Sequence, residues 1–219
     1  MGLVQKGLLG TVKGSVGPIV FCQLKGQQVA KSKPTKSNKP LTLKQETQQL
    51  KFGMVTEFLS HFTELIRIGF KPDNAKGSGM NAAVQTVINE HVLGIYPDFT
   101  IDYANVKLAD GKVMEGPDRL VVKALPEREI ELSWQPANDR DLAIKAAKNK
   151  DGAYVVFYDP KASRNIVVKG FETRGDGKMT VYIPRSMNGG TVHGWIAFIS
   201  EDGKQTSASE YLGAIVPLV

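Results

Sequence analysis

The spacing of hydrophobic residues changes twice along this chain and divides it into three zones. In the first zone, residues 1–40, a short apolar run at Pro18–Leu24 is followed by a turn at Lys25-Gly26 and a second candidate strand at Gln28–Lys31. Two such runs on either side of a glycine turn are typical of a β-hairpin. The next stretch, KSKPTKSNKP, has too little apolar surface to bury, which predicts an extended, lysine-rich arm.

The second zone, residues 41–96, follows a helical period. Thr42 and Gln45 form a capping box, which predicts the start of a helix because each side chain can bond the other's backbone amide. Apolar residues then recur every three or four positions up to Gly69, and a second stripe begins at Met80 after a polar loop. The first stripe consists of Phe52, Val55, Leu59, Phe62 and Ile66. The zone therefore predicts a pair of helices.

The third zone, residues 97–219, follows the period of β-strands. Turn signals separate eight candidate strands at the intervals of an all-β sandwich. These are Phe99–Leu108, Leu120–Ala124, Glu129–Trp134, Tyr154–Tyr158, Ile166–Phe171, Met179–Ile183, Val192–Ile199 and Ser207–Val216. The predicted fold class is α+β: an N-terminal β-hairpin and basic arm, a helical pair, then a C-terminal antiparallel immunoglobulin-like β-sandwich. We expect residues 97–219 to fold alone, because their strand set is self-contained.

Two resemblances agree with this division. The order of strands around EIELSW and YVVFY resembles a fibronectin type III or immunoglobulin-like sandwich. The chain also resembles an uncharacterised family of bacterial proteins, mostly from Bacteroidota, with a glycine-rich N-terminus. The resembling pieces are GLLGTVKGSVGPIV, KGQQVAKSKP, KPLTLKQETQQLKFGMVTEFL and TVHGWIAFISEDGKQTSASEYLGAIV. They come from both ends of the chain, and the resemblance implies no activity for particular residues.

Positive charge is concentrated in the first quarter of the chain. Residues 1–51 contain nine lysines and one acid, Glu46, a net charge of +8. The whole chain carries +6, which leaves −2 for residues 52–219. A basic head on a nearly neutral body is typical of a segment that contacts a partner.

Few residues have the spacing of a catalytic, cofactor or metal site. The histidines His61, His91 and His193 form no HxxxH pair, and Cys22 has no CxxC partner, so no metal site is predicted. No GxSxG elbow or phosphate loop is present, and no cofactor or small-molecule substrate is evident. His193 could make a site with Trp195 and Tyr211 by tertiary contact, or be an ordinary strand histidine. We therefore expect a protein that is not an enzyme.

The sequence also bears on the compartment. The apolar residues of the first 22 positions are interrupted by Lys6, Lys13 and several glycines, so no classical signal peptide is predicted. No run approaches the roughly 18 apolar residues of a membrane helix, and no membrane partner is predicted. The single cysteine favours a reducing compartment. We expect synthesis in the cytoplasm, with non-classical export or release by lysis left open.

The lysines of the arm are the first candidate site. They are Lys25, Lys31, Lys33, Lys36, Lys39, Lys44 and Lys51. Their spacing could follow a phosphate backbone, with binding driven by counterion release and without sequence specificity. Two alternatives stay open: the arm is a solvated linker, or it docks on an acidic patch of another copy of the same protein.

The apolar residues of the hairpin are the second candidate site. They are Leu8, Leu9, Val12, Ile19, Phe21 and Leu24. A lone hairpin is marginal in water, so it must pack on its own chain or on a neighbour. The predicted function is a structural protein that self-assembles into a filament or shell-like homo-oligomer through this segment and exposed strands. The alternatives are a sequence-nonspecific nucleic-acid-binding protein and strands that close their own sheet.

Overall fold

The structure is a computed structural model that describes residues 2–4, 12–24, 26–35, 39–70, 77–111, 116–136, 148–187 and 190–218. The chain divides into two compact units. The first comprises residues 1–43 and the second residues 44–219.

The first unit is an antiparallel sheet with the strand order β1-β4-β3-β2. Its strands are β1 (Gly2–Val4), β2 (Gly14–Val16), β3 (Ile19–Leu24) and β4 (Gln27–Ser32). The predicted hairpin is present as β3 and β4, but the prediction of a hairpin alone was wrong, because β1 pairs with β4 and β2 with β3. Gly17, at φ 56°, supplies the positive φ that the tight turn between β2 and β3 requires.

The arm after this sheet is shorter than the sequence predicts. Lys31 and Ser32 belong to β4, where they pair with Val20 and Ile19. The backbone amide of Lys33 donates a hydrogen bond to the carbonyl of Pro18 at 2.7 Å, which extends the pairing by one residue. The described residues 33–35 and 39–42 are neither helical nor extended in a sheet, and helix α1 (Leu43–Ser60) begins directly after Thr42, as the capping box predicts.

The helical zone differs from its prediction in two places. The first helix breaks at His61 and Phe62, whose amides bond the carbonyls three residues back, and a short helix α2 (Thr63–Gly69) follows. This break lets Phe62 enter the core at 1% exposure. Phe52, predicted in the buried stripe, is 53% exposed.

The second predicted helix is present as α3 (Gly79–Glu90), but the following residues form a hairpin. Strand β5 (Val92–Ile95) pairs with β6 (Asp98–Ile101), so the strand predicted at Phe99–Leu108 ends at Ile101. Gly94 lies inside β5 at φ 93°, where a Cβ atom would approach the carbonyl oxygen of Asp98 to 2.3 Å. Glycine here permits close approach of the two paired strands.

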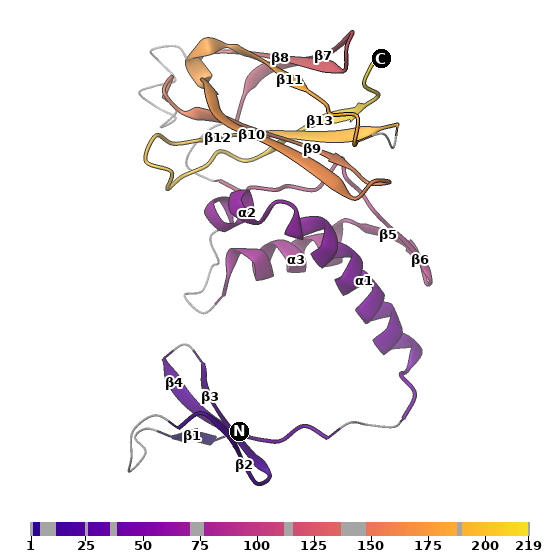
Figure 1. Ribbon diagram of the computed structural model, residues 1–219, viewed down its shortest axis with the longest axis vertical. Coiled ribbons are helices and arrows are strands. Elements are labelled where there is room, and N and C mark those ends of the chain that lie inside the picture. Colours follow the sequence, from indigo (N-terminus) through magenta and orange to yellow (C-terminus); the bar gives the residue numbers. More distant parts are fainter. Residues whose placement is uncertain are drawn as a thin grey trace. The chain divides into compact units, whose positions relative to one another are not determined.

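The remaining strands form the two sheets of the expected sandwich (Figure 1). The three-stranded sheet has the order β11-β8-β7, with β7 (Asp118–Leu125), β8 (Glu129–Gln135) and β11 (Lys178–Tyr182). The four-stranded sheet has the order β10-β9-β12-β13, with β9 (Gly152–Asp159), β10 (Arg164–Thr173), β12 (Val192–Ile199) and β13 (Glu210–Ile215). Every pair is antiparallel, and this three-plus-four arrangement confirms the α+β fold with an immunoglobulin-like sandwich.

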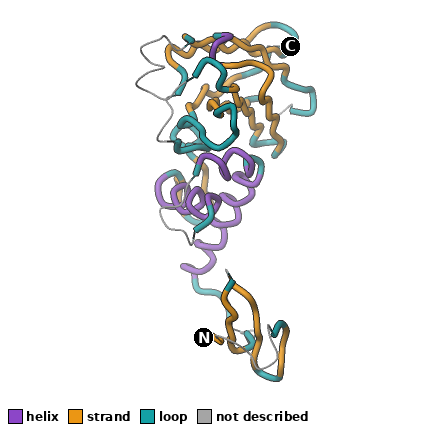
Figure 2. Tube along the Cα trace, turned by 90° about the vertical axis from the view of Figure 1, so that its left-hand side faces the viewer, coloured by secondary structure: helices purple, strands orange, loops and turns teal. Residues whose placement is uncertain are grey.

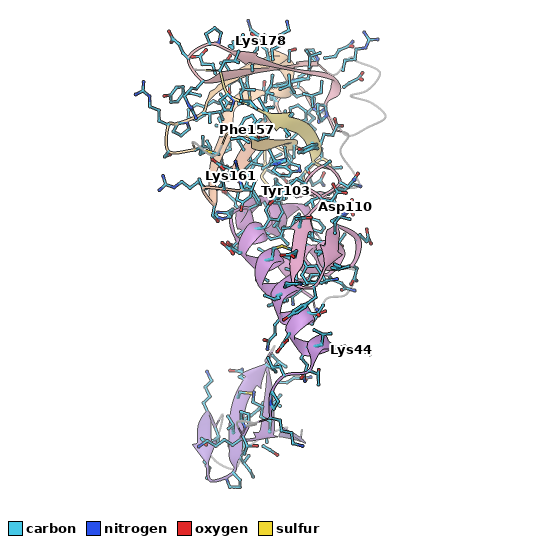
Figure 3. The ribbon with its side chains drawn as sticks, turned by 90° about the vertical axis from the view of Figure 1, so that its right-hand side faces the viewer. Lys44, Tyr103, Asp110, Phe157, Lys161 and Lys178 are labelled. Atoms are coloured by element: carbon cyan, nitrogen blue, oxygen red, sulfur yellow. The ribbon has the colours of Figure 1, made fainter. Side chains whose placement is uncertain are left out.

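One hydrophobic core fills the space between the two sheets. Ile130, Leu132 and Trp134 of β8 face Phe157 of β9 and Phe198 of β12, all almost fully buried. Phe157 is labelled within the strands of the sandwich (Figure 3). The indole nitrogen of Trp134 donates to the carbonyl of Arg174 at 2.8 Å, so its polar atom stays paired inside the core.

A second core lies on the opposite face of the four-stranded sheet. Phe58 and Phe62 from the helices pack with Tyr158 of β9 and Trp195 of β12. Figure 2 shows the helices as a layer against the strands of this unit. The helices and the sandwich therefore share one core, which differs from the predicted division at residue 97.

Candidate functional site

The N-terminal sheet buries few of its own side chains. Among its described residues only Val29 and Gln28 are buried, at 3% and 9% exposure. In contrast, Val16, Ile19 and Leu24 are 62%, 43% and 57% exposed. Val16 pairs with Ile19, and successive side chains alternate across a strand, so Leu24 lies on the other face. Both faces of this sheet thus present apolar side chains.

The predicted self-assembly residues gather on this sheet where the structure describes them. Ile19, Phe21 and Leu24 lie on β3, and Val12 precedes β2. The side chain of Gln28 donates a hydrogen bond to the carbonyl oxygen of Val12 at 2.6 Å, which ties that segment to β4. The remaining two predicted residues, Leu8 and Leu9, lie outside the described residues.

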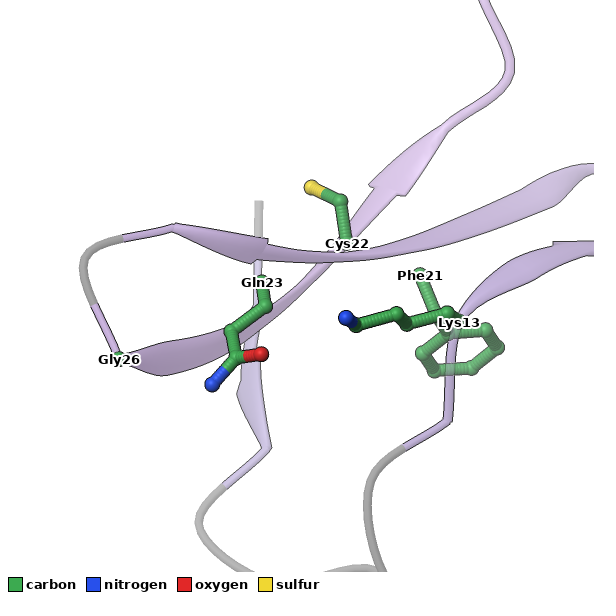
Figure 4. Close-up of a pocket in the computed structure, with 5 residues that line it drawn as sticks. All are labelled: Lys13, Phe21, Cys22, Gln23 and Gly26. Carbon is green, nitrogen blue, oxygen red and sulfur yellow. The ribbon is translucent and has the colours of Figure 1, made fainter.

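A hollow of about 560 Å³ opens on the same sheet (Figure 4). It is lined by Lys13, Phe21, Cys22, Gln23 and Gly26. Phe21 and Gln23 point to one side of β3 and Cys22 to the other, as strand alternation requires (Figure 4). Cys22 is half-buried.

The lysines of the predicted site do not share one environment. Lys31, Lys33, Lys39 and Lys44 are exposed, whereas Lys25 and Lys36 lie outside the described residues. The amine of Lys51 instead lies 4.9 Å from the ring centre of Phe99, a cation–π contact within the larger unit. Lys51 therefore stabilises the packing of β6 on α1, a role that the sequence prediction missed.

Of the two readings that the sequence leaves open for His193, the structure shows the tertiary contact with Tyr211 and Trp195. The Nδ1 atom of His193 lies 2.6 Å from the hydroxyl oxygen of Tyr211, and the His193 ring lies 4.3 Å from the ring of Tyr103. Trp195 packs against Tyr211 and donates from its indole to the carbonyl of Val106 at 3.0 Å. Burial lowers the pKa of His193 and raises the pKa of Tyr103 to about 12. These aromatic rings pack against one another at the edge of the helix–sheet core.

We expect the free energy of unfolding to fall as the pH drops below about 6.5, the ordinary pKa of histidine. The folded protein holds the pKa of His193 below that value, so the unfolded chain takes up the proton first and protonation favours unfolding. Urea denaturation at pH 7.5 and pH 5.5 measures the loss, and His193→Gln should reduce it. Asp151 and Glu210, whose pKa values burial raises, act in the opposite direction equally in both proteins. Equal pH dependence in the two proteins would contradict this prediction.

A second polar cluster joins the break between α1 and α2 to the turn between β9 and β10. The Nδ1 atom of His61 lies 3.2 Å from the side-chain oxygen of Asn165, whose amide donates to the carbonyl of His61 at 3.0 Å. Ser163, at φ 48°, lies 3.5 Å from His61 Nε2 and donates to the carboxylate of Glu57 at 3.3 Å. A serine nucleophile needs its proton directed to the imidazole, whereas this hydroxyl is shared with a carboxylate. We assign the cluster the role of fixing the helices on the sandwich.

Within the described part of the chain, no group of three or more histidine, cysteine, aspartate or glutamate side chains is placed to hold a metal ion. Among the same residues, none of the helices combines the length and the apolar character needed to cross a bilayer.

Comparison with known proteins identifies a family and several similar structures. Residues 11–213 match DUF6266, which is described as a family of unknown function. No protein with a curated description matches the chain. Similar solved structures include a fibronectin type III domain of human collagen alpha-1(XX) chain and the FN5 domain of Drosophila Lar.

The collagen alpha-1(XX) domain is 9% identical to this chain, with a TM-score of 0.34, and the match covers 49% of this chain and 88% of that domain. The FN5 domain of Lar is 12% identical, with a TM-score of 0.33, and the match covers 49% of this chain and 99% of that domain. A fibronectin type III domain of human contactin 1 is 13% identical, with a TM-score of 0.28, over 48% of this chain and 77% of that domain. The fold assigned above rests on the strand order of the two sheets.

Proposed function

The chain belongs to the DUF6266 family, whose function is unknown, and we propose that it is a non-enzymatic structural protein that assembles with copies of itself. The observation that carries this proposal is the N-terminal sheet, which presents exposed apolar side chains on both faces and buries only Val29 and Gln28 among its described residues. Burying a large apolar side chain contributes about 1.5–3 kcal/mol. A sheet that leaves Val16, Ile19 and Leu24 in water is therefore stabilised when another surface covers these side chains.

The position of the sheet in the chain supports exchange between copies. Residues 33–42 join it to the larger unit, and ten extended residues reach about 33 Å. A sheet on such a tether can contact a neighbouring subunit as readily as its own. If each copy donates its sheet to the next without closing a ring, the product is a filament; closed exchange gives a shell or ring. A Bacteroidota origin and synthesis in the cytoplasm, with non-classical export or release by lysis as the open alternatives, belong to the same proposal.

The direct test is the mass of the full-length protein in solution, measured by light scattering. The proposal requires a mass greater than that of one 23.9 kDa chain. Treatment with nuclease should leave this mass unchanged, because the contacts are between protein surfaces.

A second candidate function, sequence-nonspecific nucleic-acid binding, is favoured by one observation. The first 45 residues contain eight lysines and no acid, and Lys31, Lys33, Lys39 and Lys44 are exposed. Such a segment can neutralise phosphates and release their counterions.

We expect that changing Lys31, Lys33, Lys36 and Lys39 to glutamine would lower the salt slope of duplex DNA binding by about 3.6 if all four contact phosphates. Fluorescence anisotropy over a series of salt concentrations measures this slope. The control changes four exposed lysines of the larger unit: Lys107, Lys161, Lys178 and Lys204. Absence of DNA binding by the wild-type protein at low salt, or an equal effect of both variants, would exclude this function for the arm.

A further inference from the structure

On the larger unit, exposed apolar side chains lie on the β5–β6 hairpin and on α1 beside it. Leu93 and Ile95 of β5 and Tyr96 of the turn are 53%, 83% and 39% exposed, and Leu50 of α1 is 46% exposed. We call these four residues the acceptor strip. Figure 1 shows the β5–β6 hairpin beside α1.

Specific contacts hold the acceptor strip together. The hydroxyl of Tyr96 donates to the carboxylate of Glu46 at 3.1 Å, and the amine of Lys51 lies over the ring of Phe99. Glu46 and Leu50 are four residues apart on α1, so they share one side of the helix. The hairpin is thus fixed against α1, and its apolar side chains stay exposed in a preformed surface.

The charges around the acceptor strip complement those of the N-terminal sheet. Residues 90–102, which contain the hairpin, include Glu90, Asp98 and Asp102 and no lysine or arginine. The first turns of α1 beside the hairpin add Glu46, Lys44 and Lys51, so acids outnumber lysines by four to two. Residues 1–39 contain seven lysines and no acid. Opposite charge around apolar centres favours pairing and fixes orientation.

The geometry points to the acceptor strip as the surface on which the N-terminal sheet of a second copy docks, a proposal that rests on the proposed function. Val16 and Ile19 of the donated sheet would cover Leu93 and Ile95 of the acceptor. Lysines around the donated sheet would meet the acids of the hairpin. Because donor and acceptor are different surfaces, the contact is heterologous and repeats from copy to copy.

The test compares two double variants of the full-length chain by light scattering. The acceptor variant, Leu93→Ser with Ile95→Ser, should weaken self-association at least about tenfold. The control, Val121→Ser with Phe171→Ser, removes apolar residues of similar exposure, 47% and 84%, elsewhere on the unit. It should assemble like the wild type, and all variants should keep the wild-type melting temperature, because the changed residues are exposed.

Mixing identifies the occupant of the acceptor strip. The donor variant, Val16→Ser with Ile19→Ser, should not assemble alone, but mixed with the acceptor variant it should form a 1:1 pair through the one intact interface. Failure of the mixture to pair, or equal losses in the control, would overturn the proposal.

The remaining outcomes separate this inference from the proposed function. An acceptor variant that assembles like the wild type, beside a donor variant that does not, would overturn the acceptor strip and leave self-assembly through the sheet standing. A wild-type chain that is monomeric because its sheet docks on its own body would overturn both.

Discussion

Residues 97–219, produced alone, should fail to give a soluble domain that melts cooperatively. The four-stranded sheet of the sandwich is buried on both faces, and this fragment lacks the helices that cover one of them. It would expose Tyr154, Tyr158 and Trp195, which are at most 5% exposed in the full chain. The expectation drawn from the sequence was the opposite, so this experiment decides between the two accounts.

The size of the expected effect follows from burial. Six apolar side chains of residues 43–69 are at most 2% exposed: Val55, Phe58, Leu59, Phe62, Leu65 and Ile66. Full burial of such side chains contributes about 1.5–3 kcal/mol each. Their combined contribution is comparable with the whole stability of a domain, about 5–15 kcal/mol. The loss of the helices should therefore unfold the sandwich rather than merely weaken it.

A longer fragment serves as the control for this experiment. Residues 41–219 retain Thr42, the α1 start and both cores, and should be soluble with one cooperative thermal transition. Circular dichroism and analytical size exclusion compare the two fragments. A soluble, cooperatively melting fragment of residues 97–219 would show that the sandwich is independent and that the shared core is dispensable.

Removal of residues 1–40 should convert an assembling protein into a folded monomer. The N-terminal sheet forms its own compact unit, so its loss leaves the two cores of residues 44–219 intact. The melting temperature of the shortened chain should stay close to that of the full-length protein at low concentration. Light scattering and thermal melting, performed on the same samples, check both parts of this expectation.

Two results would contradict the account of this deletion. A shortened chain that still assembles would move the interface to the larger unit. A shortened chain that aggregates or melts at a much lower temperature would show that the sheet completes the core of its own chain.

Strand positions could be predicted from the sequence because they depend on local periodicity. Val192–Ile199 matches β12, and the other sandwich strands from Leu120 onward overlap their predictions. The sequence prediction did not include the second core, between the helices and the four-stranded sheet. In β8, Glu131 and Ser133 alternate with Leu132 and Trp134, as in a strand with one solvent-exposed face. In contrast, β9 reads AYVVFY without alternation, because helices cover its other face.

Where the sequence misled, contacts between distant residues outweighed local pattern. Phe99–Leu108 reads as one strand, yet β6 ends at Ile101, where its pairing with β5 ends. Strands β1 and β2 are too short, at three residues each, for periodicity to identify them. At the break, His61 is hydrogen-bonded to Asn165, which is more than a hundred positions away along the chain, so no local signal could reveal this contact.

In the candidate site too, local features could be predicted from the sequence and features that depend on distant contacts could not. The apolar set on β3 was readable from composition, but the exposure of both sheet faces required the strand register. The acceptor strip could not be predicted, because it joins Leu50 to Ile95 through tertiary contacts. Lys51 was grouped with the arm by charge alone, while its packing on Phe99 sets it apart.

The measurement that tests self-assembly most directly is the mass of the full-length protein by light scattering, from low to high micromolar concentration and beside the chain of residues 41–219. The account predicts that the full-length mass exceeds 23.9 kDa and rises with concentration, while the shortened chain stays at the mass of one chain. A full-length protein that keeps the mass of a single chain at every concentration would contradict it.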